Sequence, residues 1–135
     1  MTDLPEHHRK ILELLDELEA LTARTAPDEA ALAALRYKLS RASSARRKAI
    51  ESLCARFEVE LPEKAAEPVR ALRESVGTVL THSAEHVGTW GMRDIVRDWP
   101  GYCHASFNMR RAMREQIDRE KLVLYPLIDG VNATP

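Results

Sequence analysis

The stretch that decides the fold is Gln116-Ile117-Asp118-Arg119-Glu120-Lys121-Leu122-Val123-Leu124-Tyr125-Pro126-Leu127-Ile128. Ile117, Leu124 and Ile128 fall on one face at 3.6 residues per turn, joined by Met113 one turn earlier, and this spacing predicts the end of a long helix that the proline stops. Glu120 lies inside the same face, about 60° from Ile117. A carboxylate in an apolar core is costly unless it is paired or binds a metal, so Glu120 needs a partner.

Length and composition indicate one domain, residues 1–135, with an ordered core over about residues 4–128. The net charge is −1 and the pI is about 6.5, which gives no reason to expect nucleic acid or a membrane surface as a partner. No apolar run approaches the ~18 residues of a transmembrane helix, and the first residues do not resemble a secretory signal. Cys54 and Cys103 do not form a disulfide framework, so we expect two free thiols in a cytoplasmic protein.

Four amphipathic helices separated by prolines are predicted near residues 4–23, 28–57, 66–98 and 102–127. Asp3 is the expected N-cap of the first helix, and Asp28 or Pro27 begins the second. Trp99-Pro100-Gly101 is expected to end the third helix, and residues 130–135 to form a disordered tail. Helices with short connections predict an all-α, antiparallel up-down-up-down four-helix bundle.

Polar residues within the apolar stripes are the candidate site residues, because such bundles build metal sites from side chains that project inward. The first helix contributes His8, among Leu4, Ile11 and Leu15. The second contributes Arg46, about 20° from Leu35, although its head group could also reach solvent. The last contributes Glu120, with Gln116 at its flank. A lone histidine on an apolar face is more often a hydrogen-bonded core residue than a ligand.

The third helix carries His82 and His86, which share a face because they are spaced i,i+4 and could chelate a metal. With Val76 as origin they fall about 120° and 80° away from the apolar stripe. A pair at the edge of a stripe is more often two half-exposed histidines, and the glycines of this helix leave its rotation open.

The chain resembles the hemerythrin-like (HHE cation-binding) family over about residues 4–128. The resemblance rests on His8 early in a Leu-rich helix, on Leu35-Arg36-Tyr37-Lys38-Leu39, and on Glu120 followed by Leu124-Tyr125-Pro126-Leu127. It implies a bundle in which all four helices supply His and carboxylate ligands to two irons. The ligand places of the last helix then fall on Gln116 and Glu120, and those of the second helix on Arg46 and Ile50.

Neither Arg46 nor Ile50 can bind a metal, and Arg46 brings a fixed positive charge to the place of the cation. We therefore expect an Arg46–Glu120 interaction in place of the metal, with His8 and Gln116 beside it and no cofactor. The expected function is a non-enzymatic regulatory or protein-interaction module, monomeric or homodimeric, whose protein partner is unknown.

The alternative is a sensor or store of oxygen, nitric oxide or iron. It would bind iron or zinc through a reduced ligand set of His8, His82, His86 and Glu120. A histidine phosphotransfer bundle using His82 or His104 ranks third, because nothing around either histidine marks such a site.

Overall fold

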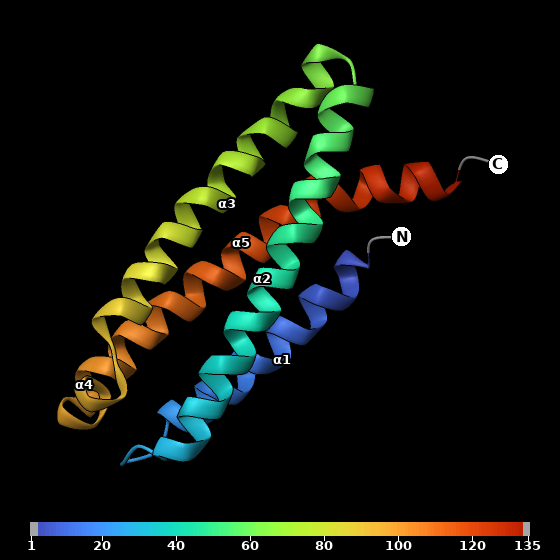
Figure 1. Cartoon of the computed structure of the whole chain (residues 1–135). Coiled ribbons are helices and arrows are strands. Elements are labelled where there is room, and N and C mark those ends of the chain that lie inside the picture. The colour runs from blue at the N-terminus through green and yellow to red at the C-terminus, as the bar shows by residue number, and fades with distance from the viewer. Residues whose placement is uncertain (1–2, 134–135) are drawn as a thin grey trace.

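The protein is all-α in the computed structural model, which describes residues 3–133 and their side chains as far as residue 130. The helices are α1 (Leu4–Thr22), α2 (Glu29–Glu60), α3 (Glu63–Thr89), α4 (Met92–Arg97) and α5 (Trp99–Ala133), and no strand occurs in the described part. The long helices run in alternating directions along the chain, as Figure 1 shows. α2 and α5 each pack against both α1 and α3.

Aspartates cap the first two helices. Asp3 accepts a hydrogen bond from the Glu6 backbone N–H over 3.3 Å, and Asp28 accepts one from that of Ala31 over 3.1 Å. Each bond satisfies one of the four N–H groups that the start of a helix leaves without an intrahelical partner. Both predicted starts are confirmed to within a residue, while α2 runs to Glu60 rather than to residue 57.

The predicted third helix, residues 66–98, is wrong in its bounds, because the chain forms two helices there. α3 starts at Glu63, ends at Thr89, and is followed by the short α4. Trp90 leaves the helix at φ −108° and ψ 75°, and its carbonyl accepts a hydrogen bond of 2.6 Å from the Arg36 guanidinium. The Trp90 ring packs edge-on against Tyr102. These contacts with Arg36 of α2 and Tyr102 of α5 stabilise the break between α3 and α4. The glycines near it permit the break because their helix propensity is low.

The residues Trp99-Pro100-Gly101 were expected to end a helix, but they form the first turn of α5. Asp98 accepts a hydrogen bond of 3.1 Å from the Gly101 N–H. Pro100 lies in the first turn, where a backbone N–H would have no intrahelical acceptor, so its lack of an N–H costs no hydrogen bond. A Cβ at Gly101 would overlap the Asp98 carboxylate, so a larger residue there would require the capping side chain to move. Proline therefore marks a helix start at this point, and not an end.

Pro126 was expected to stop the last helix, yet α5 continues through it to Ala133. Proline removes one backbone hydrogen bond and crowds the preceding turn, and Figure 1 shows the last part of α5 bending away from the rest. Leu127 and Ile128 remain half-buried against the core beyond the proline, which offsets part of that cost. The expected disordered tail is wrong for residues 130–133, which are helical, while residues 134–135 lie outside the described part.

The apolar core consists of two clusters, one toward each end of the molecule. The first contains Ile11, Leu15, Leu18, Leu35, Ala42, Tyr102, Met113 and Ile117 among others, and the second Leu4, Ala49, Ile50, Leu53, Phe57, Val69, Leu72 and Leu124. Most residues of the predicted stripes of the first, second and last helices are buried as expected, while Leu39 and Ile128 are half-buried. The apolar stripe expected on the third helix includes Leu80, Val87 and Trp90. It is wrong for Leu80 and Val87, which are 40% and 58% exposed, whereas Trp90 packs against the first cluster.

Cys54 and Cys103 are both free thiols, which confirms the prediction that they do not pair. Within residues 3–133, no helix combines the length and the apolar character that crossing a membrane requires.

A candidate site in a buried polar network

A polar layer separates the two apolar clusters. On α1, His8 lies between Leu4 of the second cluster and Ile11 of the first. Arg46 on α2 and Glu120 on α5 hold the same intermediate position, Arg46 between Ala42 and Ala49, and Glu120 between Ile117 and Leu124. His8 and Glu120 are fully buried, and Arg46 and Gln116 are each 1% exposed. These four side chains therefore lie in the interior, shielded from water.

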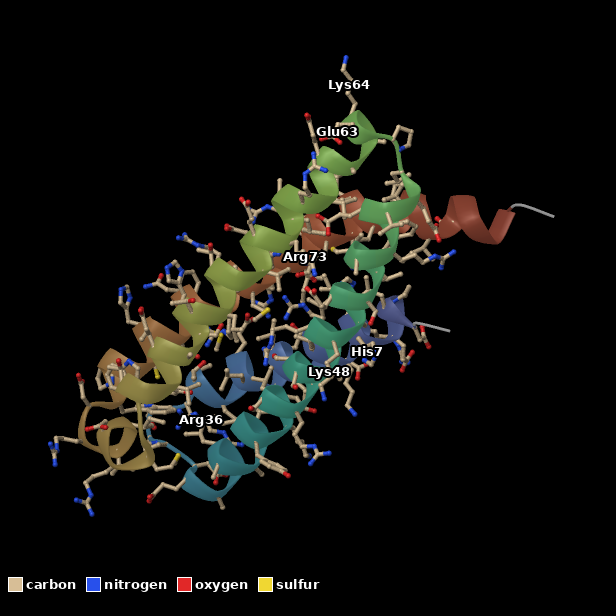
Figure 2. The ribbon with its side chains drawn as sticks, turned by 45° about the horizontal axis from the view of Figure 1, so that its top comes forward. His7, Arg36, Lys48, Glu63, Lys64 and Arg73 are labelled. Carbon is tan, nitrogen blue, oxygen red and sulfur yellow. The ribbon has the colours of Figure 1, made fainter. Side chains whose placement is uncertain are left out.

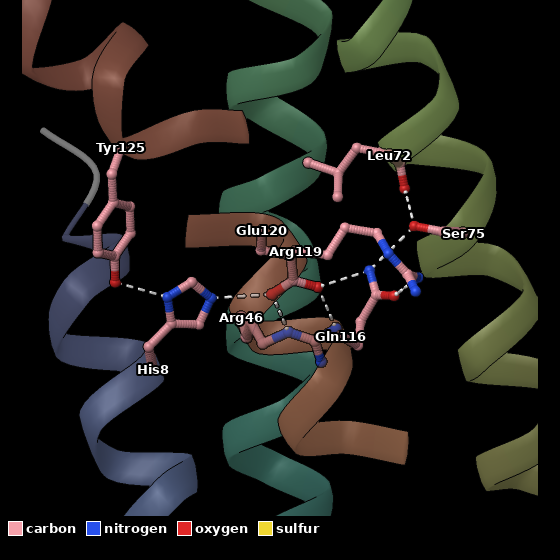
Figure 3. A network of polar contacts seen from close by, with 8 residues as sticks. All are labelled: His8, Arg46, Leu72, Ser75, Gln116, Arg119, Glu120 and Tyr125. Carbon is pink, nitrogen blue, oxygen red and sulfur yellow. Dashed lines mark hydrogen bonds and ion pairs between the residues drawn. The ribbon is translucent and has the colours of Figure 1, made fainter. Parts of the chain in front are cut away.

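Glu120 is the hub of this layer, as Figure 3 shows. Its Oε1 accepts hydrogen bonds from Arg46 Nε over 2.9 Å and from His8 Nε2 over 2.8 Å. Its Oε2 accepts from Arg46 Nη2 over 2.7 Å and from Gln116 Nε2 over 3.1 Å. A carboxylate has about four lone-pair positions, so these donors use its accepting capacity in full. The planar fork of Arg46 binds both oxygens, the geometry of a strong charge-assisted pair.

His8 connects the carboxylate to Tyr125, whose hydroxyl lies 2.7 Å from His8 Nδ1. A neutral imidazole satisfies both contacts when Nε2–H donates to Glu120 and Nδ1 accepts the Tyr125 hydroxyl proton. In this arrangement the three side chains of His8, Arg46 and Glu120 together carry one positive charge, on Arg46, and one negative charge, on Glu120. Neither imidazole nitrogen then has a lone pair directed at open space.

Gln116 extends the network to the remaining long helix. Its Nε2 also lies 3.1 Å from Ser75 Oγ on α3, and its Oε1 accepts a bond of 2.8 Å from Arg119. The Ser75 hydroxyl in turn donates to the Leu72 carbonyl over 2.7 Å. Side chains from α1, α2, α3 and α5 thus meet through one connected set of hydrogen bonds, which fixes the register of the four helices relative to one another.

The electrostatics of the network favour the ionised carboxylate. Burial by itself raises the pKa of Glu120, but the hydrogen bonds from His8 and Arg46, the Arg46 charge and the Gln116 hydrogen bond together outweigh it. The pKa of Glu120 therefore lies below its ordinary value of 4.5. The ion pair is present at neutral pH, and the buried carboxylate is not held protonated as a general acid would be.

The residues of the predicted alternative ligand set are not all brought together. His8 meets Glu120, whereas His82 is exposed and His86 is half-buried and stacked on Tyr102 at 5.9 Å. His82 and His86 line a separate pocket of about 260 Å³ that includes neither His8 nor Glu120. Across residues 3–133, no group of three or more His, Cys, Asp and Glu side chains is placed to hold a metal ion.

Tyr125, Ser75 and Arg119 were not identified as site residues from the sequence. Tyr125 had been noted only as part of the helix end, although its hydroxyl needs a partner when the ring packs inward. Ser75 is adjacent to Val76 of the apolar stripe, and that position is the one sequence signal that could have indicated it. Hydroxyl partners of this kind depend on how neighbouring helices are packed.

A second buried cation, Arg110 on α5, also escaped the sequence analysis. It is 5% exposed and donates to Thr22 Oγ1 over 3.0 Å and to Ser106 Oγ over 2.7 Å. Its Nε is buried without a hydrogen-bond partner among the described residues. Arg110 and Ser106 continue the stripe of Met113 and Ile117 at helical spacing, which was the available signal.

No family model, curated protein or solved structure matches this chain.

Proposed function

We propose that this chain is a non-enzymatic hemerythrin-like module, an antiparallel up-down-up-down four-helix bundle in which the Arg46–Glu120 pair stands in place of a metal centre. Its role is regulatory or protein-binding, in the cytoplasm. The proposal extends the resemblance noted in the sequence, because Arg46 and Gln116 occupy the places at which that family carries metal ligands. In this chain both side chains donate hydrogen bonds to Glu120.

The observation that carries the proposal is the full occupation of Glu120 by nitrogen donors. A metal ion would have to displace the Arg46 fork and the His8 N–H to reach the carboxylate oxygens. It would then share a buried space with the guanidinium, whose charge is permanent. Repulsion between a divalent ion and that charge is large where water is absent. Ile50, at the other ligand place of α2, is packed in the second apolar cluster.

The test is the metal content of protein purified without a metal-affinity tag, followed by titration with Fe²⁺ or Zn²⁺. We expect no stoichiometric iron or zinc, and no rise in melting temperature on adding either ion. A variant that restores ligands, Arg46→His with Ile50→Glu and Gln116→His, should gain metal affinity if its fold survives.

One equivalent of bound iron or zinc in the wild type, lost in Glu120→Ala, would overturn the proposal and support a metal-binding sensor or store. The variant His82→Ala with His86→Ala is the matched control, because it removes two histidines from outside the network. Binding lost only in that control would place a metal elsewhere and would leave the network metal-free.

A further inference from the structure

A pocket of about 420 Å³ shares no residue with the Glu120 network and is separate from the site of the proposed function. α2 and α3 are joined by a short connection at one end and lie further apart toward the other, as Figure 1 shows. The pocket occupies this wider part, with α1 and α5 contributing to its walls. Its volume lies within the ~300–1,000 Å³ typical of small-molecule sites.

The wall that α2 provides is polar along a single stripe. The stripe consists of four pocket-lining residues on one face of the helix, at spacings of four, three and four residues: Arg36, Ser40, Ser43 and Arg47. The rest of the lining is largely apolar, including Leu39, Leu80, Val87, Tyr102, Met109 and Met113. The pocket thus combines an apolar interior with a polar strip that carries an arginine at each end.

The two arginines differ in what they already bind. Arg36, which is labelled in Figure 2, donates a hydrogen bond of 2.6 Å to the Trp90 carbonyl at the connection between α3 and α4. Arg47 is half-buried, and its guanidinium makes no hydrogen bond or ion pair with the described residues. Burial, followed by the neighbouring Arg46 charge, lowers the pKa of Arg47. An anion beside Arg47 would favour its charged form and so offset both effects.

The wall that α3 provides leaves room for a ligand. Ser83, Ala84 and Gly88 line the pocket, and a Cβ added at Gly88 would meet nothing within 4 Å. Leu80 and Val87 stand at the same wall with 40% and 58% of their surface exposed. Apolar side chains of this size are more stable when covered, so a bound apolar body would remove their surface from water.

We propose that this pocket binds a small amphipathic carboxylate, with its anionic group on Arg47 and its apolar body against Leu39, Leu80 and Met109. The unpaired guanidinium supplies a bidentate donor for a carboxylate, and Ser43, one turn before it on the same face, supplies a hydroxyl. The apolar lining supplies most of the binding free energy, and the arginine selects the charge of the ligand.

Decanoate is the probe for calorimetric titration, with 1-decanol as the uncharged ligand of equal chain length. Wild type should bind decanoate at least about tenfold more tightly than decanol, as expected for one hydrogen-bonded ion pair. Arg47→Met keeps an unbranched side chain like the arginine stem but removes the charged guanidinium. It should therefore abolish the preference for decanoate and leave decanol binding unchanged. Arg41→Met, an exposed arginine of the same helix outside the pocket, is the charge control and should bind like wild type.

The pocket itself is tested with Gly88→Phe, which should block both ligands. Gly77→Phe is the matched control, because Gly77 also lies on α3 with open space around its Cβ but does not line the pocket. Equal binding of the two ligands by wild type, or undiminished decanoate binding by Arg47→Met, would overturn the proposal. A third outcome would also overturn it: a wild-type dimer that decanoate does not dissociate but that Gly88→Phe converts to a monomer. In that case a second copy of the chain would fill the pocket. Unchanged circular dichroism must accompany each comparison.

Discussion

The guanidinium of Arg46 on α2 binds both carboxylate oxygens of Glu120 on α5, through Nε at 2.9 Å and Nη2 at 2.7 Å. The two residues are 74 positions apart in sequence, and each lies in the apolar stripe of its helix. Their pairing joins helices that are not consecutive, at the level where the core divides into two clusters. Replacing a whole buried ion pair by apolar residues of similar volume is often neutral for stability, whereas removing one partner leaves an unpaired buried charge.

Removing either partner should be strongly destabilising, because the other is left as an unpaired buried charge. Glu120→Ala is expected to lower the free energy of unfolding by about 3–5 kcal/mol, measured by chemical denaturation. Glu60→Ala breaks the exposed pair of Arg56 and Glu60, at 3.0 Å, and should cost no more than about 1 kcal/mol. Equal costs in the two variants would show that the Arg46–Glu120 pair is not buried as described.

Removing both charges together should cost less than the two single changes added. In Arg46→Met with Glu120→Gln, the new amide oxygen can still accept the His8 Nε2–H, and no unpaired charge remains. A double-mutant cycle should give a coupling free energy of about 0.5–3 kcal/mol. Additive single effects would mean that the two side chains do not interact in solution.

The network should make stability depend on acid pH. Because the pKa of Glu120 is below its ordinary 4.5 in the folded state, its stabilisation is present above about pH 4.5. It is lost as the pH falls through the folded-state pKa. The difference in unfolding free energy between wild type and Glu120→Gln should therefore be largest at pH 6–7 and should shrink below pH 4.5. A difference that stays constant down to pH 3 would contradict the lowered pKa.

Arg110 should behave in the opposite way to Arg46. It is buried against neutral hydroxyls with an unsatisfied Nε, so its replacement removes a desolvated charge and orphans no carboxylate. We expect Arg110→Met to be neutral or stabilising by thermal denaturation, whereas Arg46→Met is destabilising. Arg111→Met, at the exposed neighbouring position, gives the baseline for losing one surface charge. A loss of several kcal/mol in Arg110→Met would indicate an acidic partner for that guanidinium.

The thiols should be slow to react in the folded protein. Burial, followed by the Glu58 charge, raises the pKa of Cys54 to about 11, and burial also raises the pKa of Cys103. Because the thiolate is the reactive form, a disulfide reagent at pH 8 should modify Cys54 mainly when the chain unfolds. Denatured, unreduced protein should titrate as two free thiols. Rapid labelling of native Cys54 would contradict its burial.

Helix positions and inward faces could largely be predicted from the sequence, because the spacing of apolar residues is a local property. The spacing placed His8, Arg46 and Glu120 inside their stripes, and all three are buried. The cost of leaving such charges unpaired then predicted that Arg46 and Glu120 meet. The same reasoning found the caps at Asp3 and Asp28, since a helix start needs an acceptor at a fixed spacing.

Only the tertiary structure decided what proline and glycine do in this chain. α5 continues through Pro126, with Leu127 and Ile128 half-buried against the core beyond it. Pro100 lies in the first turn of α5, which Asp98 caps. Packing likewise turned His82 outward, chose Tyr125 and Ser75 as hydroxyl partners, and left Arg47 unpaired beside a pocket. Local spacing fixes which face of a helix is apolar, but which groups meet depends on the angle and register at which helices pack.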